Sequence, residues 1–158
     1  MSKQPEGPTP GFLVWRLSMK WRAAVDRALA PLGLTHAHYA VLSSLFGMER
    51  AGLRPSQREL ADHTGLETLY VSKLARTLDS DGLIHRIRDP RDARTVRLTL
   101  TDRGRDAVRP AIATVQELVD RLLEPLGGRD DPRTAAFVRH LTTLLDAPLG
   151  APSSQRSP

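Results

Sequence analysis

Two short stretches of the chain gather side chains that donate hydrogen bonds or carry positive charge. The first has helical periodicity from about residue 68 to residue 79, with its regularly spaced apolar residues on one face. The second is a charged turn that contains Arg91 and Arg94. Hydroxyl, ammonium and guanidinium groups bind phosphates and base edges, and apolar side chains can contact thymine methyl groups. The residues off the apolar face of the first stretch are Thr68, Leu69, Tyr70, Ser72, Lys73 and Arg76.

The neighbouring elements must position these two stretches. The run Ser56-Gln57-Arg58-Glu59 matches a capping box at the start of a short helix, which ends near Gly65. The period changes to two over residues 83–88 and 95–100, which predicts a β-hairpin with residues 89–94 at its tip. A short helix, a tight turn, an amphipathic helix and a hairpin together indicate a winged helix-turn-helix, whose second helix lies in the major groove of DNA.

The tip of the hairpin has two interpretations. Arginine at such a tip can enter an adjacent minor groove, where narrow A·T geometry concentrates negative potential. Alternatively, the tip is a solvated turn with internal pairs between aspartate and arginine. The helix-turn-helix before it favours the first interpretation, with Arg91 and Arg94 as the candidates.

Further helices are predicted on both sides of this lobe. Apolar residues at three- and four-residue spacing predict a helix over 12–30, and Thr35 is a plausible N-cap for the next one. Thr101 should cap a long helix that Pro110 kinks or weakens, and Asp131, followed by proline, should start the last helix. The expected fold is therefore mainly α with one small β-hairpin.

Both ends of the chain are rich in proline. Residues 1–10 and 147–158 lack apolar periodicity, so we expect disordered arms there. The remaining residues, 11–146, have the length of a single domain that can bury its own core.

The positive charge is concentrated in the middle of the chain. The 158 residues include 23 Lys+Arg and 18 Asp+Glu, for a net charge of +5. Residues 50–109 hold 13 basic and 9 acidic side chains, so +4 of the excess lies there. All but three of the basic residues are arginine, which suits contacts to phosphate and guanine but is also common in proteins of GC-rich genomes. This distribution is typical of a nucleic-acid-binding surface.

Several classes of protein are excluded by what the sequence lacks. Without cysteine there are no disulfides, thiolate catalysts, thiolate metal sites or thiol redox sensors. No apolar run approaches the ~18 residues of a membrane span and no signal-peptide pattern opens the chain, so we expect a cytoplasmic protein with no membrane partner. No nucleophile elbow, P-loop, HExxH or dinucleotide fingerprint is present, so neither an enzyme nor a cofactor is expected.

Three motifs carry a resemblance to a known family. They are Ser56-Gln57-Arg58-Glu59-Leu60-Ala61, then Val71-Ser72-Lys73-Leu74 with Asp81-Gly82-Leu83-Ile84, and the wing Arg86-x-x-Asp89-Pro90-Arg91-Asp92-x-Arg94 with Leu98-Thr99-Leu100-Thr101-x-x-Gly104. On these motifs the chain resembles the MarR (multiple antibiotic resistance regulator) family of transcriptional regulators. The resemblance covers about residues 12–146.

The resemblance implies a homodimer that binds a roughly palindromic operator on double-stranded DNA, with repression as the family default. Residues 11–34 and 102–146 would be the dimerisation helices, and residues 35–101 the DNA-binding lobe. The leucine-rich segment 134–145 independently needs an apolar partner, and a twofold dimer suits a palindrome. A monomer with an internal helix bundle is the alternative.

The resemblance also implies individual contacts. Ser56 and Gln57 would hold phosphate at a helix start, and Arg76 would reach a phosphate or a guanine. Asp92 would orient the wing by pairing with arginine, and Arg94 would enter the minor groove. The recognition-helix positions would be Thr68, Leu69, Tyr70, Ser72 and Lys73.

The chain departs from the family at two places. Relatives often have small hydroxyl residues at the positions of Leu69 and Tyr70, which bears on the base preference. They often have glutamine at the position of His38, which bears on the surroundings of the second helix.

A small-molecule site is also implied, because many relatives release DNA when a phenolic or aromatic anion binds between the first, second and fifth helices. Here the candidate residues are Trp15, Arg16, Met19, His38 and Tyr39, with Arg16 as the carboxylate clamp. The simpler interpretation is that these side chains serve core or dimer packing.

Two other functions stay open. A zinc-responsive regulator would use His36 and His38, joined by His63, His85 or His140, although no helical HxxxH pair occurs. A winged-helix module that binds protein instead of DNA is the other alternative. The salt dependence of DNA binding would discriminate, because each neutralised phosphate steepens it.

Overall fold

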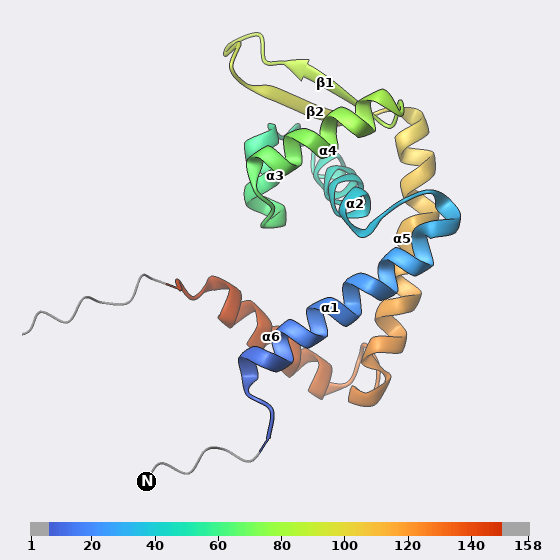
Figure 1. Cartoon of the computed structure of the whole chain (residues 1–158), viewed down its shortest axis with the longest axis vertical. Helices are drawn as coiled ribbons and strands as arrows, with labels where there is room; N and C mark the ends of the chain where they lie inside the picture. The colour runs from blue at the N-terminus through green and yellow to red at the C-terminus, as the bar shows by residue number, and fades with distance from the viewer. Residues whose placement is uncertain (1–6, 150–158) are drawn as a thin grey trace, which may run out of the picture. The chain divides into compact units, whose positions relative to one another are not determined.

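The computed structural model describes residues 7–149 and places the helices and the hairpin in the predicted order (Figure 1). The elements are α1 (Pro10–Leu29), η1 (Ala30–Leu32), α2 (His36–Arg50), α3 (Gln57–Thr64), α4 (Thr68–Ser80), β1 (Ile84–Arg88), β2 (Val96–Leu100), α5 (Asp102–Leu123), η2 (Glu124–Leu126) and α6 (Pro132–Asp146). The predicted fold class, mainly α with one hairpin, is confirmed. Most of the two predicted disordered arms, residues 1–6 and 150–158, lies outside the described residues.

The chain divides into two compact units, Met1–Gln116 and Glu117–Pro158. The first unit contains α1 to β2 and the first part of α5. The second contains the end of α5, the short η2 turn and α6. The helix-turn-helix and its hairpin therefore belong entirely to the first unit.

Local capping determines where the helices begin. The Thr9 hydroxyl accepts a hydrogen bond from the N–H of Phe12 at 3.3 Å, and Pro10 occupies the first turn, so α1 starts earlier than residue 12. The carboxylate of Asp131 accepts from the N–H of Arg133 at 2.8 Å and starts α6 as predicted. These bonds satisfy N–H groups that have no partner inside the helix.

The core of the first unit takes side chains from α1 to α5 and from both strands. Burial of such aliphatic side chains is the main term that stabilises the fold. The largest fully buried side chains are Leu29, Leu42, Leu45, Leu60, Leu78, Ile84, Leu98, Val25, Val41, Val71 and Val108.

The hairpin is extended by a third segment of chain. β1 and β2 pair antiparallel along their whole length. On the other edge of β2, the N–H of Leu98 donates to the carbonyl of Pro55 at 2.9 Å, and Ser56 forms a bridge with Arg97. The start of α3 is therefore joined directly to the hairpin, a pairing that the sequence pattern did not predict.

The long helix α5 begins against the turn that follows α4. The hydroxyl of Thr101 donates to the carbonyl of Gly82 at 2.7 Å and accepts from the N–H of Gly104 at 2.9 Å. The N–H of Thr101 also donates to the carbonyl of Leu83 at 3.0 Å. A Cβ atom at Gly104 would lie 1.9 Å from that carbonyl oxygen, so only glycine permits this approach. From there α5 runs on as one helix past Pro110.

Each unit leaves an apolar helix face in contact with solvent. In the first unit, Trp15 and Val14 on the first half of α1 are more than half exposed, whereas Val25 and Leu29 on its second half are fully buried. In the second unit, the exposed large side chains of α6 are Val138, Leu141, Leu144 and Leu145. Among residues 7–149, no helix is both long enough and apolar enough to cross a membrane.

Candidate nucleic-acid interface

One face of α4 is free for contact with a partner. Its apolar side chains are buried in the core, as the spacing predicted. On the opposite side, Thr68, Lys73 and Arg76 are exposed, Ser72 is half-buried, and Leu69 is 85% exposed. A leucine side chain that is exposed to this extent, with polar residues around it, suits contact with a thymine methyl group.

Tyr70 differs from the other residues predicted on this face. Its side chain lines a hollow of about 430 Å³ together with Arg22 and Asp26 of α1 and Thr35 before α2. Tyr70 therefore borders the junction between α1 and α2, although 40% of the residue remains exposed. Sequence periodicity placed Tyr70 on the face of α4 but could not give the direction of its ring.

The start of α3 is held by the predicted capping box. The hydroxyl of Ser56 accepts from the N–H of Glu59 at 3.1 Å, and the Glu59 carboxylate accepts from the N–H of Ser56 at 2.6 Å. Ser56 is only 8% exposed, so in the free protein it caps the helix. The phosphate contact predicted for it stays a prediction. The neighbouring Gln57 has a buried side-chain oxygen that has no hydrogen-bond partner within residues 7–149.

At the tip of the hairpin, the aspartates bond to the backbone. Asp89 accepts from the N–H of Arg91 at 2.8 Å, and Asp92 accepts from the N–H of Arg94 at 3.0 Å. Asp92 also accepts from the hydroxyl of Thr95 at 2.9 Å. Within residues 7–149, the exposed guanidinium groups of Arg91 and Arg94 make no hydrogen bond or ion pair, so both are available to a partner.

The predicted pairing of Asp92 with an arginine is therefore corrected. The ion pair of the hairpin joins Asp89 to Arg97, with 2.7 Å between the carboxylate oxygen and Nε. Asp92 instead shapes the turn through the backbone N–H of Arg94, a common use of aspartate in turns. The aspartate whose side chain binds arginine is thus Asp89, at the point where β1 passes into the tip, and not Asp92.

Arg97 also binds two groups outside the hairpin. Its Nη1 atom donates to the Arg54 carbonyl at 2.8 Å and to the Glu59 carboxylate at 3.2 Å. Hydrogen bonding to Asp89 raises the pKa of Arg97, and the pKa of Asp89 is lowered first by the N–H of Arg91 and then by Arg97. The N–H of Ser56 lowers the pKa of Glu59, and Arg97 lowers it further.

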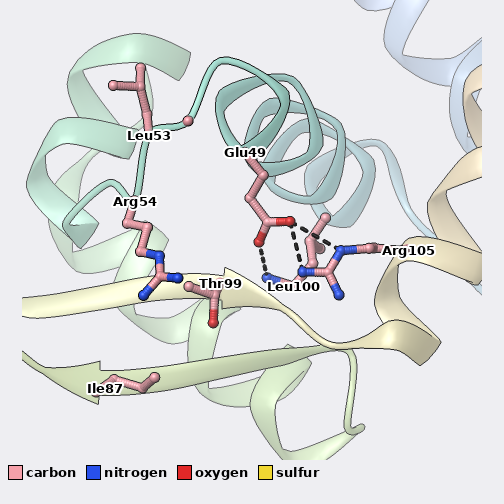
Figure 2. Close-up of a pocket in the computed structure, with 8 residues that line it drawn as sticks. Glu49, Leu53, Arg54, Ile87, Thr99, Leu100 and Arg105 are labelled. Carbon is pink, nitrogen blue, oxygen red and sulfur yellow. Dashed lines mark hydrogen bonds and ion pairs between the residues drawn. The ribbon is translucent and has the colours of Figure 1, made fainter.

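A second carboxylate fixes the end of α2 to the hairpin and to α5. Figure 2 shows Glu49 between the backbone of Leu100 and the side chain of Arg105, at a hollow of about 420 Å³. Glu49 accepts from the N–H of Leu100 at 2.7 Å and from Nη2 of Arg105 at 2.9 Å. Arg105 also pairs with Asp102 at 2.9 Å, and its pKa is raised mainly by the bond to Glu49.

The sequence patterns did not predict that Glu49, Arg97 and Arg105 hold the hairpin to the neighbouring helices. Glu49 and Arg105 lie 56 residues apart, so no local pattern links them. The contact between Asp89 and Arg97 had a usable signal, because a hairpin with its tip at residues 89–94 brings these two positions close together.

The residues predicted to bind a small molecule lie on two helices. Trp15, Arg16 and Met19 are exposed on α1, whereas His38 and Tyr39 are half-buried on α2. Burial raises the pKa of the Tyr39 hydroxyl, and a hydrogen bond with Ser43 opposes the shift. That these five side chains form one binding site stays a prediction.

His38 has a definite structural role. Its N–H donates to the hydroxyl of Thr35 at 3.2 Å, and its Nδ1 atom accepts from the N–H of Thr35 at 3.4 Å. This is a capping box in which histidine takes the place usually held by glutamate or glutamine. Histidine therefore serves here the capping role that glutamine could also serve.

The zinc hypothesis finds no support in the described part of the chain. Residues 7–149 contain no group of three or more His, Asp or Glu side chains that could hold a metal ion. His36 sits instead near Asp26, whose carboxylate accepts from the His36 N–H at 2.7 Å. Burial lowers the pKa of His36; the charge of Asp26 opposes this shift and that of Arg22 adds to it.

Comparison with known proteins identifies the family. The model of the MarR family matches residues 32–95. The uncharacterised HTH-type transcriptional regulator YdcH of Bacillus subtilis (strain 168) is 36% identical over 110 residues, which are 70% of this chain and 75% of that protein. The HTH-type transcriptional repressor Rv2887 of Mycobacterium tuberculosis (strain H37Rv) is 32% identical over 134 residues, 85% of this chain and 91% of that protein. The chain belongs to the MarR family.

Solved structures agree with this membership. The transcriptional repressor CouR, bound to a 23-mer DNA duplex, matches with a TM-score of 0.74 and 30% identity over 91% of this chain and 99% of that chain. The MarR family protein Rv2887 of M. tuberculosis, in complex with salicylic acid, matches with a TM-score of 0.65 and 30% identity over 89% and 99%. This chain is accordingly a MarR-type DNA-binding transcriptional regulator, and it belongs to a family of regulators rather than enzymes.

Proposed function

We propose that the protein is a homodimeric repressor that binds a palindromic operator, with α4 in the major groove and the hairpin tip in the minor groove. The observation that carries the proposal is the free tip: the guanidinium groups of Arg91 and Arg94 are exposed and make no hydrogen bond or ion pair among residues 7–149. Unpaired arginine at a narrow projection suits the negative potential of an A·T-rich minor groove.

Base reading in the major groove rests on the exposed face of α4. Lys73 and Thr68 supply donors, Arg76 lies one turn further on, and Leu69 supplies an apolar surface. Tyr70 belongs to the edge of this face, since it lines the same hollow as Arg22. CouR, which is 30% identical to this chain, has been seen bound to a DNA duplex, and this likeness supports the assignment.

The dimer rests on the apolar helix faces that the two units leave exposed. We assign residues 11–34 and 102–146 to dimerisation and residues 35–101 to DNA binding. Trp15 on α1 and Leu145 on α6 are 56% and 85% exposed, and faces of this kind usually mark an interaction site. A twofold dimer presents two copies of α4 to the two halves of a palindrome.

The salt dependence of DNA binding tests the proposal. Genomic footprinting of the protein would first identify a bound site, and fluorescence anisotropy would then follow binding to a duplex of that site across a range of salt concentrations. With several phosphates neutralised, the logarithm of the association constant should fall with slope of about −0.9 per phosphate. Affinity that does not change with salt would contradict DNA binding and favour a protein-interaction module.

A second part of the proposal concerns release from DNA by a small aromatic acid. Rv2887, 32% identical to this chain, has been solved with salicylic acid. Arg16 is exposed on α1 near Trp15 and Met19, and its guanidinium could bind a carboxylate in bidentate fashion. Calorimetry with salicylate and other aromatic acids should show binding that Arg16→Ala weakens and that lowers DNA affinity. No binding by any acid of the panel would contradict this part.

A further inference from the structure

We infer that Arg97 is a positioning residue that fixes the direction of the hairpin relative to the helix-turn-helix, so that α4 and Arg94 can reach adjacent grooves together. The inference rests on the proposed function, because it presupposes that the hairpin tip contributes to DNA binding. Arg97 itself lies in β2 and is not placed at the DNA.

The geometry shows one guanidinium shared by three parts of the lobe. Its Nε atom binds Asp89, the residue at which β1 passes into the tip, at 2.7 Å. Its Nη1 atom binds the carbonyl of Arg54, just before α3, at 2.8 Å. The same Nη1 atom binds Glu59 in the first turn of α3 at 3.2 Å. A change in the angle of the hairpin would break at least one of these bonds.

The contact to Glu59 connects Arg97 to the cap of α3. The Oε2 atom of Glu59 accepts both from Nη1 of Arg97 and from the backbone N–H of Ser56, at 2.6 Å for the latter. Ser56 in turn forms a bridge with Arg97 across the edge of β2. The start of α3 and the hairpin are thus held together by backbone and side-chain bonds of the same residue.

The chemistry requires arginine at this position. Two nitrogen atoms of a rigid planar fork bind groups in different directions, whereas lysine would offer a single nitrogen at the end of a flexible chain. The side chain of Arg97 is 37% exposed and that of Glu59 is 59% exposed, so solvent screens the charges and their effect on stability is small. Orientation of the hairpin is therefore the property that should respond most to the loss of Arg97.

Arg105 provides a matched control. It is also a guanidinium held by two carboxylates, and its side chain is 35% exposed, close to the 37% of Arg97. Arg105 binds Glu49 and Asp102, however, and neither of these lies at the tip of the hairpin. A purely structural role of Arg97 would give the two arginines the same behaviour.

The test is a double-mutant cycle on the full chain, with the footprinted duplex as the DNA probe. Arg94→Ala alone should weaken binding by about tenfold. Arg97→Gln alone should weaken it by about fivefold, but by less than about twofold when Arg94→Ala is already present, because a tip without its contact no longer benefits from correct placement. Arg105→Gln should change affinity by the same factor in both backgrounds.

Arg97→Lys separates geometry from charge. It keeps the positive charge, and it should nevertheless behave like Arg97→Gln in the cycle. Thermal unfolding of every variant verifies that the DNA-binding change does not follow a loss of folded protein, and Arg97→Lys serves as the readout if Arg97→Gln unfolds.

The outcomes distinguish two failures. If Arg94→Ala weakens binding but the loss from Arg97→Gln is absent or equal in both backgrounds, or if Arg97→Lys binds like the wild type, the inference about Arg97 is overturned and the proposed function stands. If Arg94→Ala leaves affinity unchanged, the minor-groove role of the hairpin is overturned, and the inference falls with it.

Discussion

Arg94 and Arg97 lie three residues apart in one hairpin, and their surroundings are opposite. Arg94 is exposed at the tip, where the nearby carboxylate of Asp92 is bonded to the Arg94 backbone N–H. Arg97 lies in β2 next to the tip, where the carboxylates of Asp89 and Glu59 bind its guanidinium. The same two residue types therefore produce a free cation at the tip of the hairpin and a held cation in the strand beside it.

This difference separates the positive charge of the segment into two classes. Arginines held by carboxylates, such as Arg97 and Arg105, position backbone elements and are poorly available to DNA. Arginines whose guanidinium groups are exposed and make no hydrogen bond or ion pair among residues 7–149, such as Arg91 and Arg94, keep their charge available. A net charge counts both classes equally, although only the second should add to the salt dependence of DNA binding.

The largest effect should come from disturbing the close contact between the start of α5 and Leu83, which precedes β1. In Gly104→Ala, the new Cβ atom would lie 1.9 Å from the backbone oxygen of Leu83, so α5 has to shift. We expect the free energy of unfolding to fall by about 3 kcal/mol, measured by urea denaturation. Gly47→Ala is the control: on α2, a Cβ atom added at Gly47 would meet no atom of another element within 4 Å among residues 7–149, and the change should raise stability by about 0.5 kcal/mol. Equal effects of the two variants would contradict close packing of α5 against Leu83.

Next in size is the contribution of the tip itself. Arg94→Ala should lower operator affinity by about 1–3 kcal/mol while the melting temperature stays unchanged, because the side chain has no partner within the described residues. Lys73→Ala on α4 provides the comparison with the major groove. Both variants should be measured by anisotropy on the operator and on a random duplex of the same length. An equal loss on both duplexes would identify phosphate contacts instead of groove reading.

A smaller effect is expected from the carboxylate that joins α2 to the hairpin. Glu49→Gln should lower the free energy of unfolding by about 1–2 kcal/mol, because the bond to Arg105 loses its charge and the N–H of Leu100 keeps only a neutral acceptor. Chemical denaturation measures the change. Glu117→Gln, on an exposed position of α5, is the control and should be neutral. Loss of stability from both variants would show a general charge effect.

The smallest effect should be the response to acid of the two carboxylates that bind Arg97. The pKa values of Glu59 and Asp89 are lowered from 4.5 and 3.8, so their ionised forms stabilise the folded state above these values, and this stabilisation is lost as the pH falls through the lowered pKa values. Denaturation between about pH 7 and about pH 3 should therefore show a loss of stability below about pH 4.5. In Arg97→Gln the loss should be shallower. An identical acid profile in both proteins would show that Arg97 does not shift these groups.

Most of the fold follows from local signals. The capping box at Ser56 and the Asp131–Pro132 pair act within one helical turn, and both start helices where the sequence predicts them. The alternation in residues 95–100 likewise predicts the strand β2. Local patterns do not predict the pairing of the segment before α3 with β2, because that contact joins residues about forty positions apart.

The candidate interface is predictable to the level of a helix face and a turn. Periodicity places Lys73 and Leu69 on the exposed side of α4, and the hairpin pattern places Arg94 at the tip. It does not give the direction of the Tyr70 ring, nor which acceptor each aspartate binds. Those choices depend on three-dimensional neighbours such as Arg22 and Arg97, which lie on other elements.

Helix α1, which is exposed in its first half and partly buried in its second, also carries an intrinsic fluorescent probe. The sequence has two tryptophans, and both, Trp15 and Trp21, lie on this helix. Trp15 is 56% exposed on the apolar half of α1, so its emission should move to shorter wavelength when a second copy of the chain or an aromatic acid covers that surface. Because α4 and the hairpin contain no tryptophan, intrinsic fluorescence can follow assembly and effector binding without a signal from the DNA-reading surface.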